Sequence, residues 1–266
     1  MTTTLTHPAL VGTNLGKRYG AIEALAGVDI ALRRGEVTSL CGDNGAGKST
    51  LVKILSGATA PTTGTLQVNG EPARLRSPND AQQAGIQTVF QDLGIAPHLT
   101  VTENVFLGRE IPRRGVLGKL GMMDRKAMRT ATADAVAQVK INLPGLDYIV
   151  ESMSGGQRQA VAVSRTIARQ GSVILLDEPT AALGVQETDR VAALITRLRE
   201  SGVAVLMISH DLPMVMQLST RVVVLRHGRK VGDLVAAEHT VDDVIAYITG
   251  HRVQDHVQHS ALKEMS

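Results

Sequence analysis

Residues 42–50 combine a flexible backbone with positive charge in a pattern suited to binding phosphate. They match the pattern G-x-x-x-x-G-K-[ST]. The glycines let successive backbone N–H groups turn inward around an anion, and the helix expected next adds its positive N-terminal end. An ordinary glycine turn is the alternative, but a turn requires neither the lysine nor the serine. The predicted phosphate-contacting residues are Gly42, Asp43, Asn44, Gly45, Ala46, Gly47, Lys48, Ser49 and Thr50.

Within this loop, two side chains have separate expected tasks. We expect Lys48 to reach the β- and γ-phosphates of a nucleotide, while the Ser49 hydroxyl completes a Mg²⁺ shell. Cys41 ends the strand that enters the loop. It is the only cysteine of the chain, and we interpret it as a small buried residue with no redox role.

Two carboxylates follow the apolar run 173–176. Because adjacent strand residues point to opposite sides, Asp177 and Glu178 need not share one task. Asp177 is placed to hold Mg²⁺ through water, and Glu178 to orient or deprotonate an attacking water near the γ-phosphate. The alternative, a solvated acidic turn before Pro179, loses weight because the same chain carries a phosphate loop.

His210 follows a second apolar run, residues 203–208. A single histidine at the end of a strand is usually structural or exposed. Its functional interpretation, a contact with the γ-phosphate, therefore depends on the other motifs of the chain.

The elements expected around these residues alternate between strands and helices, which favours an α/β fold. The uniformly apolar runs 173–176 and 203–208 are typical of strands in a sheet that is covered on both faces. The other expected elements are two strands within 25–41 (the second at 37–41), a helix at 48–55, a short strand within 61–70, a strand at 86–90, helices at 130–139, 155–169 and 186–200, and a hairpin at 221–235.

Composition excludes several classes of protein. The 266 residues include five aromatic side chains and carry a formal charge of +3, so a nucleic-acid binder that stacks bases on aromatic platforms is not expected. A single cysteine excludes a disulfide scaffold. No stretch approaches the roughly 18 apolar residues of a spanning helix, and the N-terminus lacks the pattern of a signal peptide, so we expect a soluble chain.

The segment 152–159, Ser-Met-Ser-Gly-Gly-Gln-Arg-Gln, resembles the signature sequence of ATP-binding-cassette (ABC) ATPases, usually Leu-Ser-Gly-Gly-Gln. Met153 replaces the leucine conservatively. Two glycines at the start of a second helix permit close approach of a phosphate. In the family this segment caps the γ-phosphate held by the opposite protomer. The resemblance thus assigns nucleotide contacts to Ser154, Gly155, Gly156 and Gln157.

The order of motifs strengthens the resemblance, which covers about residues 8–250. Gln91 follows the phosphate loop and matches the family's glutamine loop, a Mg²⁺ ligand and a candidate for coupling to a permease. A polar surface glutamine is its alternative. Tyr19 matches the aromatic residue that stacks on adenine, against the alternative of a packing tyrosine at a strand edge. Glu178 and His210 match the catalytic glutamate and the switch histidine.

The resemblance implies an α/β fold with a P-loop NTPase (RecA-like) core, an antiparallel β subdomain and an inserted α-helical signature subdomain. On this basis residues 1–250 form one ABC ATPase domain, with a polar tail at 251–266. Residues 1–91 and 170–250 form the nucleotide-binding core. Residues 92–169 form the helical subdomain.

One loop departs from the family pattern. Where the family generally has Ser-Ala-Leu-Asp, residues 181–184 read Ala-Ala-Leu-Gly, so the contact that the aspartate makes across the dimer is not carried over to Gly184. The variant at 181–187 and the segment 99–110 are similar to ATPases of bacterial monosaccharide importers. Each motif occurs once, so the chain resembles the single-cassette, fructose-importer-like branch.

The resemblance implies an ATPase subunit of a sugar importer that uses ATP and Mg²⁺. Two copies would form a head-to-tail dimer at the cytoplasmic face of the membrane, attached through permease subunits and served by a solute-binding protein, with no nucleic acid involved. An ABC ATPase for another solute or for export is the first alternative, and a non-transport ABC protein is the second. A P-loop kinase is a third alternative, but such a kinase would lack the Ser-Gly-Gly-Gln element found here at residues 154–157.

Overall fold

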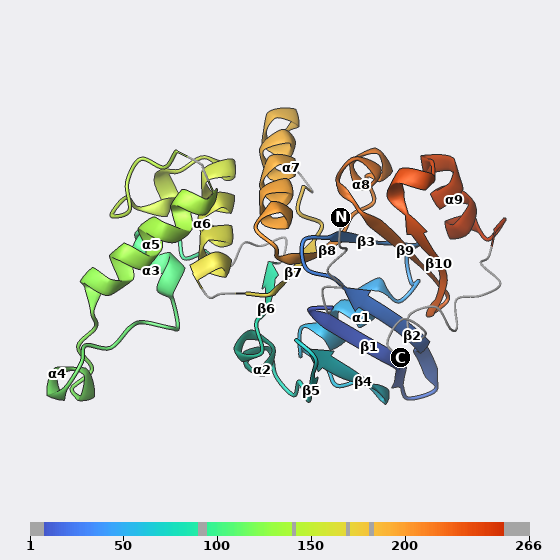
Figure 1. The fold of residues 1–266 in the computed structure, drawn as a ribbon, viewed down its shortest axis with the longest axis horizontal. Coiled ribbons are helices and arrows are strands. Elements are labelled where there is room, and N and C mark those ends of the chain that lie inside the picture. The colour runs from blue at the N-terminus through green and yellow to red at the C-terminus, as the bar shows by residue number, and fades with distance from the viewer. Residues whose placement is uncertain (1–7, 90–94, 140–141, 169–170, 181–183, 253–266) are drawn as a thin grey trace, which may run out of the picture.

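A computed structural model describes residues 8–89, 95–139, 142–168, 171–180 and 184–252. Two sheets pack against each other with helix α1 (Lys48–Leu55) between them (Figure 1). The smaller sheet is antiparallel, in the order β2-β1-β4-β5. Its strands are β1 (Leu10–Tyr19), β2 (Ile22–Leu32), β4 (Thr63–Val68) and β5 (Glu71–Ala73).

The larger sheet has the order β10-β9-β3-β8-β7-β6. Five of its strands run parallel, and β10 pairs antiparallel with β9. Because the carboxyl ends of parallel strands meet at one edge, the loops after β3, β7 and β8 share that edge. The strands are β3 (Val37–Cys41), β6 (Ile86–Val89), β7 (Val173–Asp177), β8 (Ala204–Ile208), β9 (Arg221–Arg226) and β10 (Arg229–Val235).

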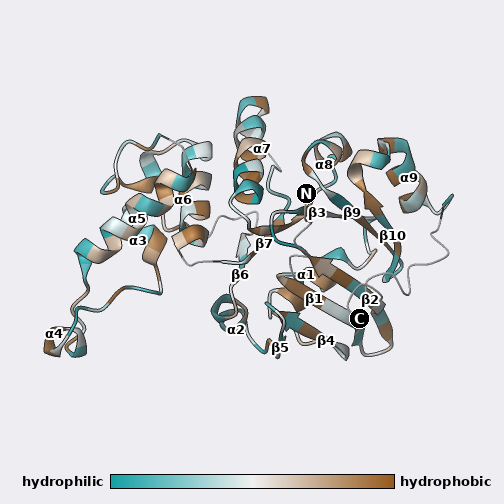
Figure 2. Ribbon diagram, viewed as in Figure 1, coloured by the Kyte–Doolittle hydropathy of each residue, from teal (hydrophilic) through white to brown (hydrophobic). Residues whose placement is uncertain are grey.

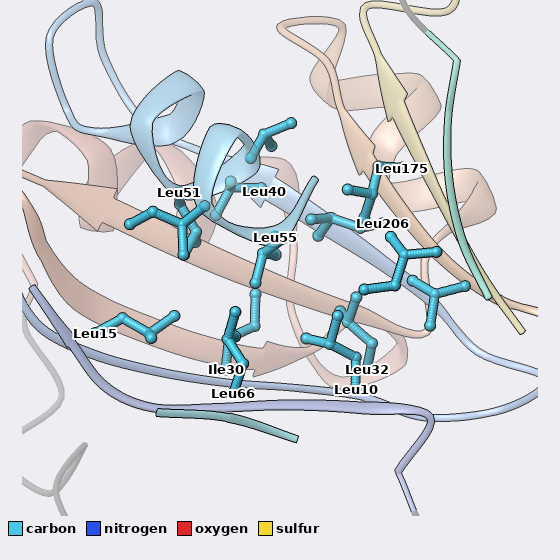
Figure 3. Close-up of a cluster of buried hydrophobic side chains, with 14 of the residues drawn as sticks. Leu10, Leu15, Ile30, Leu32, Leu40, Leu51, Leu55, Leu66, Leu175 and Leu206 are labelled. Carbon is cyan, nitrogen blue, oxygen red and sulfur yellow. The ribbon is translucent and has the colours of Figure 1, made fainter. Parts of the chain in front are cut away.

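The core is aliphatic on both sides of the larger sheet. Between the sheets, Leu51 and Leu55 of α1 lie among leucines of both sheets, including Leu66 of β4 and Leu206 of β8 (Figure 3). The opposite face of the larger sheet is covered by α6 (Gly155–Ala168), α7 (Val185–Glu200), α8 (Leu212–Leu218) and α9 (Val241–Thr249). Every residue of β3 and β8 is buried, as expected of strands covered on both faces.

A separate helical unit lies to one side of the larger sheet. It comprises α3 (Val101–Phe106), α4 (Val116–Lys119), α5 (Arg125–Val139) and α6, and it has its own hydrophobic cluster around Phe106, Met128 and Val161 (Figure 1). Its helices carry both hydrophobic and hydrophilic residues (Figure 2). Within the described ranges, no helix combines the length and apolar character needed to cross a bilayer.

Several elements differ from the sequence-based expectation. The strand β1 and the helices α2 (Pro78–Gln83), α3, α8 and α9 were not expected. Helix α5 begins at Arg125 instead of residue 130, because Asp124 accepts a hydrogen bond from Ala127 N and caps its first turn. Helix α9 begins with a reciprocal capping box between Thr240 and Asp243. A Ser, Thr or Asp directly before a helical pattern is the sequence signal that could have indicated these helix starts.

Asn104 forms a buried junction inside the helical unit. It is fully buried, and its side-chain Oδ1 accepts from Ala96 N at 2.9 Å. Its Nδ2 donates to the carbonyls of Ala96, Leu99 and Thr100 at 2.9–3.1 Å. From α6, Arg165 Nε donates to the Asn104 carbonyl at 2.9 Å. Asn104 therefore ties the loop 95–100 to α3 and, through Arg165, to α6.

Replacing Asn104 by alanine should leave buried backbone groups of this loop without partners. Each such group costs about 1–3 kcal/mol, so Asn104→Ala should lower the free energy of unfolding by at least that amount. Urea denaturation followed by circular dichroism measures the loss. The exposed Asn79 of α2 offers a matched control, and equal midpoints for Asn79→Ala and Asn104→Ala would contradict the assigned role.

Candidate functional site

The phosphate loop joins β3 to α1, and steric contacts fix its glycines. Gly42 has φ 146°, and a Cβ there would lie 2.2 Å from the Leu225 carbonyl oxygen. Gly47 has φ 103°, and a Cβ would lie 2.8 Å from the Ala24 carbonyl oxygen. Both positions therefore require glycine for space as well as for backbone conformation. The sequence predicted the glycines for phosphate access but not these close contacts.

The N-terminus of α1 is open to an anion. Gly47 provides no side-chain cap, and the first turn contains no acidic residue. By contrast, α2, α3, α8 and α9 each have a side-chain oxygen that accepts from the first turn. Lys48 Nζ donates to the carbonyls of Gly42 at 2.5 Å and Asp43 at 2.9 Å, which holds its charge against the loop. Ser49, next along the helix, is exposed.

A second loop supports the phosphate loop from the side. The turn between β9 and β10 contains Gly228, whose N–H donates to the Ala46 carbonyl at 3.0 Å. The Gly228 carbonyl accepts from Ala26 N of β2 at 2.9 Å. The turn at His227-Gly228 was expected as part of a hairpin, and its contact with the phosphate loop was not. Nothing in the local sequence indicates that contact, since it depends on how β9 pairs with β3.

Glu178 and His210 meet beside the ends of β7 and β8. The Glu178 carboxylate lies 2.9 Å from His210 Nδ1, and Glu178 N donates to the Ile208 carbonyl at 3.0 Å. Glu178 has φ 50°, a left-handed conformation that is uncommon outside glycine. Its side-chain direction is therefore set by this local turn and not by the alternation of side chains along a strand, which was the expected basis.

The charges of the site act on one another. Burial, assisted by the nearby Glu178, raises the pKa of Asp177, and the Lys48 ammonium partly offsets that rise. The hydrogen bond that the Glu178 carboxylate accepts from His210 raises the pKa of His210, and the nearby Lys48 ammonium opposes that rise. Burial raises the pKa of Cys41 to about 12, so its thiol stays protonated and the packing interpretation holds. Lys48 influences all three groups, which shows that the ends of β3, β7 and β8 converge on it.

The oxygen atoms of Ser49 and Asp177 suit Mg²⁺, which prefers hard oxygen ligands and keeps waters and phosphate oxygens in its shell. In the described part of the chain, no cluster of three His, Cys, Asp or Glu side chains could hold a metal alone. A divalent ion at this site would therefore depend on the nucleotide for its remaining ligands. Gln91, the third predicted ligand, lies outside the described residues.

The segment 154–157 lies at the start of α6, more than 100 residues after the phosphate loop. Ser154 N donates to Gln157 Oε1 at 3.1 Å, and Gln157 N donates to Ser154 Oγ at 3.4 Å. Ser154 is exposed, while Gly156 is buried. Among described residues, no hydrogen bond or ion pair joins this segment to residues 42–50. One chain therefore does not bring its two predicted phosphate-binding segments together.

Tyr19 ends β1 opposite Ile22, with 46% of its surface exposed. Lys17 Nζ lies 5.2 Å from the centroid of its ring and donates to the Ala60 carbonyl at 2.7 Å. The strand that pairs with Tyr19 continues to Ala24, which contacts the phosphate loop at Gly47. The hairpin that carries this exposed ring therefore also contacts the phosphate loop. Gly184 is exposed, and residues 181–183 lie outside the described residues.

The raised pKa of His210 has a direct test. Glu178→Gln should lower the pKa of His210 toward its ordinary value, measured by NMR titration of the ring proton. Because the folded pKa is raised, the stabilisation from this pair is present below the unfolded pKa of histidine and is lost as pH rises through the folded pKa.

The second histidine–glutamate pair, His98 with Glu151 at 3.1 Å, supplies the control for that titration. Glu151→Gln should leave the His210 titration unchanged. An unchanged His210 pKa in Glu178→Gln would show that the 2.9 Å contact has no electrostatic effect in solution.

Comparison with known proteins agrees with this geometry. The family model described as ABC transporter matches residues 25–181. The chain is 41% identical to the fructose import ATP-binding protein FrcA of Rhizobium meliloti over 92% of this chain and 95% of that protein. It is 39% identical to the ribose import ATP-binding protein RbsA of Yersinia pestis over 93% of this chain, and it spans about half of RbsA (48%).

The fold also matches solved cassettes. A dimeric bacterial ABC transporter cassette, MJ0796, has a TM-score of 0.67 at 26% identity, covering 85% of this chain and 98% of that one. The expected fold class, a P-loop core with an antiparallel β subdomain and an inserted helical subdomain, is confirmed. With a family match over more than half of its length and a relative aligned over nearly all of it, the chain belongs to the ABC transporter family.

Proposed function

We propose that this chain is the ATP-hydrolysing subunit of a bacterial importer that takes up a sugar through a partner permease. The observation that carries the proposal is the convergence of Lys48, Asp177 and the Glu178–His210 pair at one edge of the larger sheet. The sugar assignment is supported by the relatives, which are named fructose and ribose import proteins. Import of another solute, or export, is the remaining candidate.

At the nucleotide, the predicted roles follow from position. The open N-terminus of α1 and the N–H groups of residues 42–50 hold the β- and γ-phosphates, and Lys48 neutralises part of their charge. Tyr19 stacks on adenine. Ser49, Asp177 and Gln91 hold Mg²⁺, which when bound neutralises charge that develops on the phosphate oxygens.

Glu178 is the proposed general base of hydrolysis. Its carboxylate accepts a proton from the attacking water, and His210 holds that carboxylate in place through the 2.9 Å contact. The left-handed backbone at Glu178 turns this side chain toward His210 and away from the strand direction. His210 is exposed in the single chain, so it is free to contact the γ-phosphate as the site closes.

A second copy completes the site in this proposal. The exposed Ser154 and the glycines 155–156 of one copy cap the nucleotide on the phosphate loop of the other, which gives two sites per head-to-tail dimer. The separation of the two segments within one chain supports this arrangement, as does the existence of a dimeric cassette with the same fold. No cross-dimer contact is assigned to Gly184, which stands where the family generally has an aspartate.

We further propose that residues 1–250 form the ABC ATPase domain, that residues 92–169 move relative to the core on ATP binding, and that 251–266 form a tail. The permease docks beside Gln91 and places the chain at the cytoplasmic face of the membrane. A solute-binding protein delivers the sugar on the other side, and no nucleic acid takes part.

Glu178→Gln tests the proposed chemistry. The variant should bind ATP with Mg²⁺ as the parent chain does, while hydrolysis falls by about 10²-fold or more, because a positioned general base contributes on that scale. Fluorescent-nucleotide binding and phosphate release measure the two steps. Glu238→Gln, at an exposed residue of the 3₁₀ turn after β10, should keep the parental rate. Hydrolysis at the parental rate in Glu178→Gln would show that Glu178 is not the base.

The transported solute is tested in a reconstituted complex. The chain and its co-purifying permease are placed in proteoliposomes, and ATPase activity is measured with solute-binding protein loaded with different solutes. Monosaccharides should stimulate hydrolysis, and amino acids should not. Stimulation by amino acids alone would refute sugar import while leaving the ATPase assignment intact.

A further inference from the structure

Residues 107–124, between α3 and α5, form a projecting hairpin that we call the arm. At its base, Arg113 N donates to the Met122 carbonyl at 2.8 Å, and Asp124 N donates to the Ile111 carbonyl at 2.6 Å. Helix α4 forms its tip, which projects beyond α3 and α5 at the lower left of Figure 1. The arm shares no residue with the nucleotide site.

The arm has a defined conformation. Gly115 and Gly121, on either side of α4, have φ 78° and 82°, in the left-handed region that favours glycine. A Cβ on Gly118 would lie 1.8 Å from the Arg113 carbonyl oxygen, so the tip packs tightly on its own backbone. The glycines therefore fit the backbone conformation that presents α4 at the tip.

Large apolar side chains cover the tip. Val116 and Leu120 are 72% and 73% exposed. Leu117, Met122 and Met123 are also exposed, at 43–49%. Hydrophobic and hydrophilic residues alternate around α4 in Figure 2. A cluster of this kind on a small protruding element is typical of an interaction surface.

Positive charge surrounds these apolar side chains. The arm contains four basic and two acidic residues, a net charge of +2, and Arg125 and Lys126 follow directly at the start of α5. Arg113, Arg114 and Lys119 are exposed, and no hydrogen bond or ion pair of their side chains to any described residue is present. The arm is thus a positively charged element, and its base is followed by two further basic residues.

The two acidic side chains of the arm are engaged by its backbone. Glu110 Oε1 accepts from Gly108 N at 3.1 Å, and Asp124 Oδ1 accepts from Ala127 N at 3.0 Å. Neither carboxylate pairs with a basic residue of the arm in the described structure. The cations therefore face outward unneutralised.

We propose that the arm binds an anionic lipid surface, with Val116 and Leu120 inserted among the headgroups and the basic residues against lipid phosphates. Apolar side chains ringed by Arg and Lys suit the interface of a bilayer, where both the apolar burial and the charge contribute. A protein groove that binds a helix contacts side chains spaced over about two helical turns. Helix α4 has only four residues, which is too short for that mode of binding. Lipid binding by the arm goes beyond the proposed function. It rests on that function only in that an importer subunit works beside a membrane.

The size of the effect follows from the charges. Each Lys or Arg near an anionic surface strengthens binding by about fivefold. Arg113→Gln combined with Arg114→Gln should therefore weaken binding to anionic vesicles by about 25-fold. Val116→Ser combined with Leu120→Ser should weaken it by at least tenfold, because two exposed apolar side chains would no longer insert.

The experiment is sedimentation of the full chain with vesicles of phosphatidylcholine and phosphatidylglycerol, and with phosphatidylcholine alone. The parent chain should bind the anionic vesicles more tightly, and less so at high salt. Two control pairs match the variants: Arg74→Gln with Arg76→Gln, and Val235→Ser with Ile245→Ser, all at exposed residues away from the arm. Both control pairs should bind like the parent.

Three results would overturn the proposal. The first is failure of the parent chain to sediment with anionic vesicles, and the second is binding by the arm variants that equals binding by the control pairs. Unchanged vesicle binding together with loss of permease co-purification in the arm variants would make the arm a protein contact. Thermal midpoints show whether each variant is folded. ATPase activity is measured without lipid, so failure of the proposed function and failure of the arm proposal are recorded separately.

Discussion

The nucleotide site depends on one crowded point at which three parts of the fold meet. The Ala24 carbonyl oxygen of β2 lies 2.8 Å from the positions that a Cβ would take on Gly47 of the phosphate loop and on Gly228 of the β9–β10 turn. The antiparallel sheet, the loop and the last hairpin of the larger sheet thus pack without room for a methyl group. The hydrogen bonds of Gly228 to Ala46 and Ala26 join the same three parts. The loop conformation is therefore a property of both sheets together.

The residues with the strongest local constraints were the ones that the sequence predicted best. Strand β3 and helix α1 have the predicted bounds, because an apolar run, a glycine-rich loop and a helix-forming stretch each restrict the backbone locally. The apolar runs before Asp177 and His210 also form neighbouring strands, which brings Glu178 to His210. Alternation along a strand could not predict the left-handed turn at Glu178.

Other features depend on contacts between distant segments, which a single sequence does not report. The support that Gly228 gives to Ala46 requires β9 to pair with β3, and the junction at Asn104 requires α3 to pack against α6. Separating the loop 95–100 from α6 would break the hydrogen bonds that Asn104 makes to that loop and to Arg165. The segment that follows Gln91 and the helix that begins with the signature are thus bound into one unit.

The single cysteine gives the chain a practical property. Cys41 is buried at the end of β3, and its pKa of about 12 keeps the thiol protonated and unreactive at neutral pH. The sequence also contains no tryptophan. A cysteine or a tryptophan introduced at one chosen position would therefore report without background from the native chain. Spectroscopic probes can thus be placed on the helical unit or on the β1–β2 hairpin without first removing native residues.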